Sequence, residues 1–260
     1  MTREDTVKFT RNLPAALGLT LLAILARPTV VAAEEIKVLC SNGIQSVMQD
    51  LVPKFEKATG HKVVIEYNLA AVLTKQIESG APFDLAILTP SLVDGLIKQG
   101  KIVPDTRTTL ARTGLGLMIR AGARKPDIST TDAFKRALLD AKSIAYAKQG
   151  ASGVYFAELI QKLGLSESLR SKSRLTATGE EVGQSVARGE VEFGVLPLSE
   201  ILPVKGAELL GMFPADVQSY IVMTAGVSAG AKQGQVAREL IEFVTAPAAL
   251  PVIKAKGMEQ

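Results

Sequence analysis

Two short polar segments follow two apolar, strand-like runs in the first third of the chain. Ser41-Asn42-Gly43 comes directly after Ile36–Cys40, and Asn68-Leu69-Ala70 comes directly after Lys62–Tyr67. Side-chain amides, hydroxyls and free backbone N–H groups at such turns are hydrogen-bond donors that carry no charge of their own. Donors of this kind hold small anions at the starts of helices. The two segments are therefore candidates for anion binding.

Two later turns carry donors of the same kind. Thr89 follows the apolar run Phe83–Leu88, and the segment Lys148–Gly153 follows the run Ser143–Tyr146. The glycines of the second turn are typical of a phosphate loop, but no Gly-Lys-Ser/Thr pattern follows, which argues against a nucleotide site. The candidate ligand-binding residues are Ser41, Asn42, Gly43, Asn68, Ala70, Thr89, Gln149, Ser152 and Gly153.

Each of the first two turns leads into a segment with apolar residues at helical spacing. The first such segment, 44–55, ends near Gly60, and the second, 72–77, ends at Gly80. Consecutive strand–turn–helix units predict parallel strands, with the carboxyl ends of the strands and the helix N-termini facing one crevice. The chain is therefore expected to be an α/β protein with an anion-binding crevice.

The same rhythm restarts after Arg120, which predicts a second βα lobe. Continuous apolar strands at 112–120 and 220–224 are expected to cross between the lobes. An amphipathic helix near the C-terminus should return to the first lobe, because its apolar face needs a sheet to cover. We therefore expect one lobe from residues 34–119 with 214–260 and the other from residues 120–213, with a ligand cleft that closes by hinge motion.

Residues 1–33 have the pattern of a cleavable export signal. A mildly basic start precedes the apolar stretch Leu13–Ala26, and Val31-Ala32-Ala33 fits small-residue cleavage rules. We expect the mature chain to begin near Glu34 and to lie in the periplasm. Removal of four basic and two acidic residues lowers the formal charge from +4 to +2. So small a charge argues against a nucleic-acid-binding protein.

The composition excludes several kinds of chemistry. One cysteine and one histidine provide neither an internal disulfide nor a metal-binding cluster nor a Ser-His-Asp triad, so no metal and no cofactor are expected. His61 lies in a Gly-His-Lys turn and is expected at the surface. Asp84 begins a strand and is expected to fix a neighbouring loop. Ser129 and Asp132 are expected to form a helix capping box.

Three segments resemble the molybdate-binding-protein family of periplasmic solute-binding proteins. They are Phe55–Gly60, Gln76–Asp84, and Gly194 with Leu198-Ser199-Glu200. The resemblance covers nearly all of the mature chain. It implies a type II periplasmic-binding-protein fold, a small anionic ligand, an ABC permease of the inner membrane as partner, and a monomer.

The expected ligand positions depart from the family's pattern. Gly43, Ala70 and Pro197 stand where molybdate binders place two serines and a tyrosine. Each hydrogen bond that a desolvated anion loses costs about 1–3 kcal/mol, so molybdate itself is not the expected ligand. An anion with separated oxygens, such as a di- or tricarboxylate, suits the remaining donors better.

Two function hypotheses follow. The first is a periplasmic binding protein that delivers a small oxyanion or organic carboxylate to an ABC transporter. The alternative is a periplasmic aconitate isomerase, because Pro82–Pro90 and Gly150–Phe156 resemble a divergent branch of the family that includes that enzyme. An allylic proton shift needs one base, which Lys148, Tyr67 or Glu66 could supply; no spacing in the sequence selects a catalytic residue.

Overall fold

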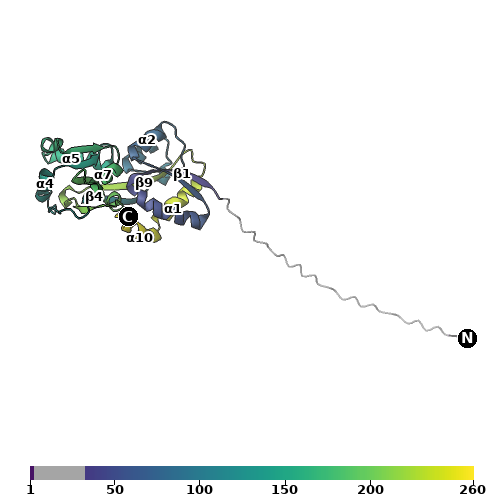
Figure 1. Cartoon of the computed structure of the whole chain (residues 1–260). Coiled ribbons are helices and arrows are strands. Elements are labelled where there is room, and N and C mark those ends of the chain that lie inside the picture. The colour runs from purple at the N-terminus through teal and green to yellow at the C-terminus, as the bar shows by residue number, and fades with distance from the viewer. Residues whose placement is uncertain (3–32) are drawn as a thin grey trace. The chain divides into compact units, whose positions relative to one another are not determined.

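The structure is a computed structural model that describes residues 1–2 and 33–260. The expected export signal, residues 1–33, therefore lies almost wholly outside the described residues. Within the described part, no helix is both long enough and apolar enough to cross a membrane. Residues 33–260 form one compact unit. At one end lie α4 (Thr131–Asp140), α5 (Ala151–Lys162) and α7 (Gly179–Ala187), and at the other lie α1 (Gln45–Thr59), α2 (Ala70–Glu78) and α10 (Leu250–Ala255) (Figure 1).

The first lobe is built from parallel strands. β1 (Glu35–Ser41) pairs in parallel with β2 (Lys62–Asn68) and β3 (Leu85–Leu88). β9 (Tyr220–Val227) runs antiparallel between β3 and the beginning of β4 (Thr108–Arg120). The helices that follow the first three strands are α1 (Gln45–Thr59), α2 (Ala70–Glu78) and α3 (Pro90–Lys98). A short 3-10 helix, η1 (Asn42–Ile44), joins β1 to α1.

The second lobe repeats this plan around the end of β4. β5 (Ile144–Ala147) pairs in parallel with β6 (Ser173–Thr176) and β7 (Phe193–Pro197), while β7 and β8 (Ala207–Met212) pair antiparallel with β4. The helices of this lobe are α4 (Thr131–Asp140), α5 (Ala151–Lys162), α6 (Ser166–Arg170), α7 (Gly179–Ala187) and α8 (Leu198–Ile201).

β4 belongs to both lobes, as the sequence predicts for its second half. Residues 108–114 pair with β9, whereas residues 115–118 pair with β7 and residues 116–120 with β8. Gln218 binds β4 at the residue where its pairing passes from β9 to β7. The Gln218 Oε1 accepts from the backbone N–H of Leu115, and its Nε2 donates to the carbonyl of Leu115. The exact residue boundaries of the two lobes stay a prediction.

The C-terminal helices lie on the first lobe. α9 (Gly234–Thr245) buries Val236, Leu240, Ile241 and Val244, and it contacts β4, β9 and α1. α10 (Leu250–Ala255) also packs against α1. These contacts agree with the expectation that the final amphipathic helix covers the first sheet.

Asp84 ties this C-terminal segment to the first sheet. Its Oδ2 accepts from the backbone N–H of Lys37, and its Oδ1 accepts from the backbone N–H groups of Lys232 and Gln233, at 2.8–3.1 Å. The side chain is buried. The expectation that Asp84 fixes a neighbouring loop is confirmed.

Two local expectations are wrong. His61 is buried rather than exposed, because Phe55 stacks on its ring and Glu239 of α9 lies beside it, while its Nδ1 accepts from the backbone N–H of Glu34. The cap of α4 is Thr130, whose Oγ1 accepts from the Ala133 N–H, so Ser129 is not the capping residue. The sequence shows only the local neighbours of these residues. The burial of His61 depends on packing against a distant helix, and the identity of the cap depends on the exact residue at which α4 begins.

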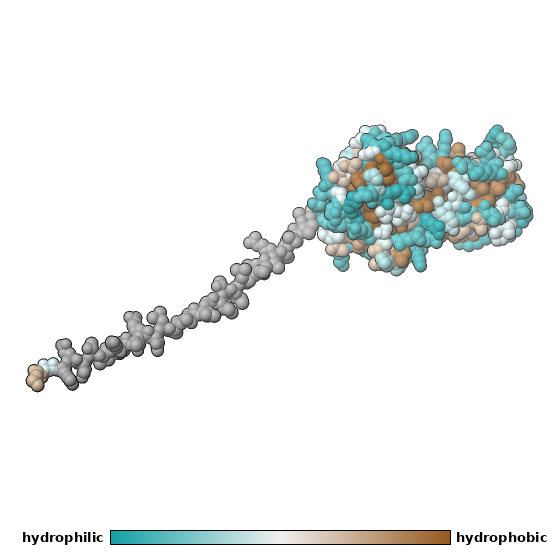
Figure 2. Space-filling model, turned by 180° about the vertical axis from the view of Figure 1, so that it is seen from behind, coloured by the Kyte–Doolittle hydropathy of each residue, from teal (hydrophilic) through white to brown (hydrophobic). Residues whose placement is uncertain are grey.

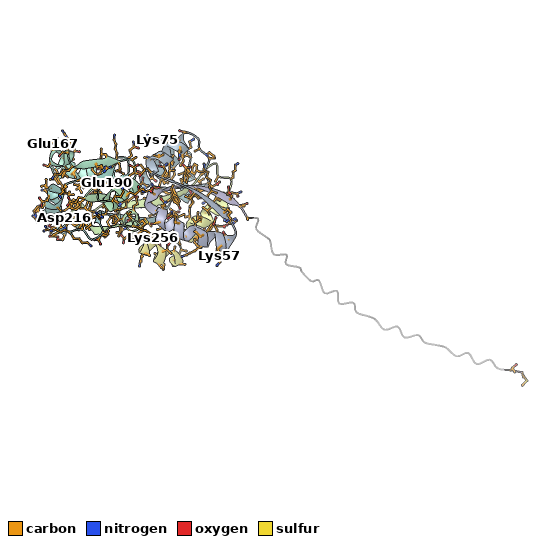
Figure 3. All side chains as sticks on the ribbon, in the orientation of Figure 1. Lys57, Lys75, Glu167, Glu190, Asp216 and Lys256 are labelled. Atoms are coloured by element: carbon orange, nitrogen blue, oxygen red, sulfur yellow. The ribbon has the colours of Figure 1, made fainter. Side chains whose placement is uncertain are left out.

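The face in Figure 2 is largely hydrophilic, with hydrophobic residues in small separate groups. Charged side chains such as Lys57, Lys75, Glu167 and Asp216 are exposed around the outside of the molecule (Figure 3).

Candidate functional site

The carboxyl ends of β1 and β2 lie side by side, as the two-unit pattern predicts. Ser41 and Asn68 are partners in the parallel register, so Asn42 and Leu69, which follow them, start neighbouring turns. Asn42 and Asn68 both line a cleft of about 730 Å³. The Asn68 Oδ1 accepts from the backbone N–H of Leu69 at 2.8 Å, an arrangement that leaves the Nδ2 group as a donor.

The cleft is lined from both lobes. The first lobe contributes η1, the start of α1 and the end of β2, and the second contributes the start of α7, α8 and the segment after it. The lining residues are Asn42, Gln45, Ser46, Gln49, Tyr67, Asn68, Thr178, Gly179, Glu180, Gln184, Ala187, Ser199, Glu200, Pro203, Val204 and Lys205. Five of them are amides, namely Asn42, Gln45, Gln49, Asn68 and Gln184.

Ser199 joins the two walls at the bottom of the cleft. Its Oγ donates to the carbonyl of Gly43 at 2.8 Å, and its own carbonyl accepts from Ser46 Oγ at 3.3 Å. Its backbone N–H donates to Thr113 Oγ1 on β4. The start of α1 and the start of α8 are thereby held together.

The other predicted site residues do not belong to the lining of this cleft. Ser41 and Gly43 are buried beneath Asn42, and the side chain of Met223 fills the space that a Cβ on Gly43 would need. Ala70 is the first residue of α2, and Thr89 is the N-cap residue of α3 without a capping side-chain bond. Neither Ala70 nor Thr89 contributes to the lining.

The turn Gln149–Gly153 lies at the start of α5, outside the cleft lining. Gln149 is exposed, while Ser152 and Gly153 are buried. A Cβ on Gly150 would lie 3.9 Å from the Leu69 Cδ2, so this turn lies against the turn of the first lobe that carries Asn68. The ligand contacts assigned to it stay a prediction.

α7 supplies a helix start that the sequence analysis did not include among the candidate site residues. Thr178 caps it by accepting from the Glu181 N–H, and Glu181 Oε2 accepts from the Ala177 N–H. The spacing Thr178-x-x-Glu181 matches the capping-box pattern, with the return bond made to Ala177 rather than to the Thr178 N–H. That spacing is the signal that could have located this turn. Gly179 and Glu180, whose N–H groups precede the first intrahelical donor, belong to the cleft lining, and free N–H groups at a helix start favour an anion.

Glu200 is another residue of the cleft lining that the sequence analysis did not list as a site residue. It appears in the sequence only within Leu198-Ser199-Glu200, directly after β7 ends at Pro197. Its carboxyl lies against Gly179, because a Cβ on Gly179 would overlap Glu200 Oε2. Among the described residues its carboxyl has no hydrogen-bond or ion-pair partner, and burial raises its pKa from 4.5 to about 7.

The raised pKa of Glu200 predicts a pH-dependent stability. The Glu200 carboxyl binds its proton more tightly in the folded chain than in the unfolded chain. The contribution of the protonated carboxyl to the free energy of unfolding is therefore fully present below pH 4.5, and it is lost as the pH rises through about 7. We expect Glu200→Gln to match the wild type in stability at pH 4 and to exceed it at pH 8 by on the order of 2–3 kcal/mol. Urea unfolding of both proteins at pH 4, 6 and 8 measures this; a difference that does not change with pH would contradict it.

The three candidate bases differ in their positions. Tyr67 lines the cleft, but burial raises the pKa of its hydroxyl, which makes it a poor base at neutral pH. Glu66 Oε1 accepts from Gln76 Nε2 of α2 at 2.7 Å, and Lys148 is exposed on the other lobe. Neither Glu66 nor Lys148 belongs to the cleft lining.

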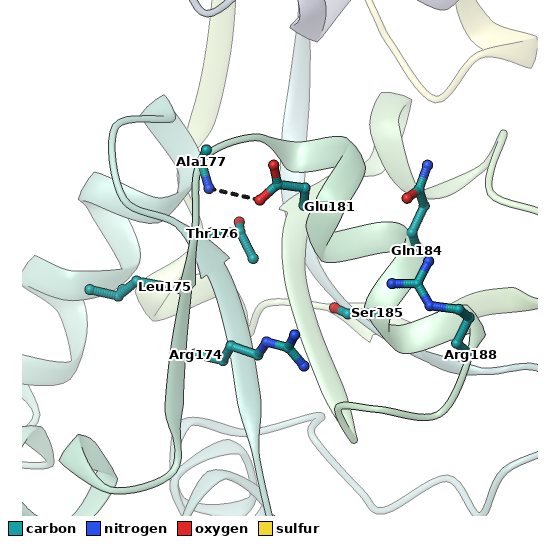
Figure 4. Close-up of a pocket in the computed structure, with 8 residues that line it drawn as sticks. All are labelled: Arg174, Leu175, Thr176, Ala177, Glu181, Gln184, Ser185 and Arg188. Carbon is teal, nitrogen blue, oxygen red and sulfur yellow. Dashed lines mark hydrogen bonds between the residues drawn. The ribbon is translucent and has the colours of Figure 1, made fainter.

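A separate pocket of about 300 Å³ lies between β6 and α7. Figure 4 shows the guanidinium groups of Arg174 and Arg188 approaching it from opposite sides. Both also lie within ion-pair distance of Glu190, at 3.4 and 2.6 Å. A ligand anion would have to compete with that carboxylate, so the larger cleft is the stronger candidate. Among the described residues no cluster of histidine, cysteine and acidic side chains has the form of a metal site.

Comparison with known proteins shows the family of the chain and agrees with the fold. The family model described as "bacterial extracellular solute-binding protein" matches residues 36–259. An aconitate isomerase from Pseudomonas sp. is 31% identical over 96% of this chain and 97% of its own length, and the molybdate-binding protein ModA of Azotobacter vinelandii is 30% identical over 95% and 96%.

Solved structures show the same two-lobed fold. The periplasmic molybdate-binding protein of Azotobacter vinelandii superposes with a TM-score of 0.74 at 22% identity, covering 86% of this chain and 99% of its own. The sulfate-binding protein SubI of Mycobacterium tuberculosis gives a TM-score of 0.73 at 15% identity, covering 86% of each chain. The expected α/β fold of two βα lobes with crossing strands is confirmed.

Proposed function

This chain belongs to the family of bacterial extracellular solute-binding proteins, and from that premise we propose that its cleft binds aconitate, a tricarboxylate, and interconverts its cis and trans isomers. The observation that carries the proposal is the chemistry of the cleft. A volume of about 730 Å³ with five amide side chains around it suits an organic anion with separated carboxylates. The relative named aconitate isomerase supports the choice of this tricarboxylate.

Molybdate fits this cleft poorly. Gly43, Ala70 and Pro197 supply no side-chain donors at the positions where the resemblance leads us to expect hydroxyls. Met223 packs where a side chain at position 43 would stand, so no donor replaces the missing one there. Amides placed around a wide cleft can instead reach carboxylates that lie several bonds apart in one ligand.

A second candidate function is delivery of the bound anion to an ABC permease. Membership of the solute-binding family and the relative named molybdate-binding protein ModA favour it. In this case the ligand is bound and released unchanged. We infer a periplasmic location and an export signal in residues 1–33 for either function, and a monomer is the expected form.

The experiment that separates the two functions is incubation of the purified protein with cis-aconitate. Formation of trans-aconitate, followed by proton NMR, supports the isomerase. Tight binding of aconitate by calorimetry without any turnover supports delivery alone. Parallel titrations with molybdate and sulfate should show weak binding or none, and submicromolar molybdate binding would overturn the tricarboxylate proposal.

We expect Asn68→Ala to weaken aconitate binding by about 1–3 kcal/mol, because the Asn68 Nδ2 group is a donor at the cleft wall. Calorimetry measures the change. Gln161→Ala is the control, since Gln161 is exposed on α5 away from the cleft lining, and it should bind like the wild type. Ser152→Ala in the same series tests the contact assigned to the turn of α5. If Asn68→Ala bound aconitate as tightly as the wild type, the ligand would not lie beside Asn68, and the proposed position of the site would be wrong.

A further inference from the structure

We propose that Glu200 is the catalytic residue that carries the proton between the two ends of the substrate's allylic unit. The inference rests on the proposed isomerase function and deepens it by assigning its base. Three features of the structure carry it: the position of the carboxyl in the cleft, the lack of a hydrogen-bond or ion-pair partner for it among residues 33–260, and the space that a glycine leaves for it.

The first feature is position. Glu200 lies on α8, directly after Ser199, which holds the two cleft walls together through Gly43. The cleft lining on the opposite lobe carries Asn42 and Asn68. A ligand whose carboxylates reach these amides therefore has Glu200 on its other side.

The second feature is the unused carboxyl. Within residues 33–260 no hydrogen bond or ion pair of the Glu200 carboxyl is found, although it lines the cleft beside Glu180 and Lys205. An ionised carboxylate without a partner repels an anionic ligand, so a protein that only binds anions gains nothing from it. Proton exchange with the ligand explains an unpaired carboxyl in this cleft, whereas anion binding alone does not.

The third feature is Gly179. A side chain at this position would occupy the place of the Glu200 Oε2. Burial against this glycine and its surroundings also brings the Glu200 pKa to about 7, so that both the acid and the base are populated at neutral pH. The other titratable groups in the lining are Tyr67, Glu180 and Lys205.

The reaction needs no other reactant. The Glu200 carboxylate removes one proton from the methylene carbon of aconitate, and the electron pair of that C–H bond spreads over the three-carbon unit and its carboxylates. The protonated Glu200 then gives a proton to the carbon at the other end of the unit, where a new C–H bond forms. The double bond has moved, and the conformation about the single bond from the methylene carbon to the central carbon, before the proton is removed, decides whether the product is the cis or the trans isomer. The amides and the N–H groups at the start of α7 stabilise the charge.

The test compares four proteins with aconitate in D₂O, with isomer formation and methylene deuteration followed by NMR and binding by calorimetry. We expect Glu200→Gln to lower kcat and deuterium exchange by about 100-fold or more, with aconitate binding unchanged or tighter because a negative charge is gone. Gly179→Ala should lower kcat by displacing the flexible carboxyl while the fold survives. Glu167→Gln, a surface carboxylate, should retain wild-type rates.

Each outcome has a distinct meaning. If the wild type isomerises aconitate and Glu200→Gln does so within threefold of it, Glu200 is not the base and the proposed function stands. If the wild type binds aconitate but neither isomerises nor deuterates it, the isomerase function and the role of Glu200 both fail. Should Glu200→Gln not fold, Glu200→Asp decides: a shortened acid is expected to retain partial activity, and full activity would overturn the assignment.

Discussion

Asp84→Ala is expected to lower the free energy of unfolding by about 3–5 kcal/mol. The buried carboxylate accepts from three backbone N–H groups, those of Lys37, Lys232 and Gln233. Alanine leaves all three donors without that acceptor, and each unmet buried donor costs about 1–3 kcal/mol. Urea unfolding followed by circular dichroism measures the loss.

Asp140→Ala is the matched control, because Asp140 is exposed at the end of α4. It should change the free energy of unfolding by less than about 0.5 kcal/mol. Asp84→Asn should lie between the two, since an amide keeps one acceptor oxygen but directs its NH₂ group at a backbone donor. A small effect of Asp84→Ala would mean that the segment before α9 does not depend on Asp84 for its attachment.

The half of the site in the first lobe is predictable from the sequence for a physical reason. β1 has a buried apolar run and β2 a β-branched one, and a turn with an asparagine follows or ends each strand, so the strand ends and the turns are visible in the residue order. Parallel pairing then places Ser41 beside Asn68 without any further information. Asn42 and Asn68 in the cleft lining follow from the same reasoning.

The half of the site in the second lobe depends on residues whose local pattern is weak. β6 is only four residues long and has partly exposed polar positions, so it has no apolar run that predicts a strand. Because no strand is predicted there, the turn Thr178–Gly179 that follows β6 could not be located from the end of a strand. α8 is four residues long, too short to show a helical period, and so Glu200 could not be placed on an element.

The properties of Glu200 are also tertiary. Its pKa depends on burial between α8 and α7, and the space for its carboxyl depends on Gly179, which is separated from it by β7 in the chain. His61 illustrates the same limit in the core. Its turn is polar in sequence, yet the return of α9 to the first lobe buries it.

Gly153→Ala is expected to lower the free energy of unfolding by about 2–4 kcal/mol. A Cβ at this position would overlap the backbone carbonyl oxygen of Ala147, and it would also lie 3.1 Å from the Ala147 nitrogen. Because the obstacle is backbone rather than a flexible side chain, α5 can relieve the overlap only by moving away from β5. Thermal and urea unfolding measure the loss.

Gly95→Ala provides the control for helical glycines. Gly95 lies within α3, and no atom stands within 4 Å of the Cβ that alanine would add. This variant should be neutral or more stable by about 0.5–1 kcal/mol, because alanine loses less backbone entropy in a helix. If Gly153→Ala instead kept its stability and lost aconitate binding, Gly153 would act at the ligand. The binding role predicted from the sequence, rather than close packing of α5 on β5, would then explain why this residue is a glycine.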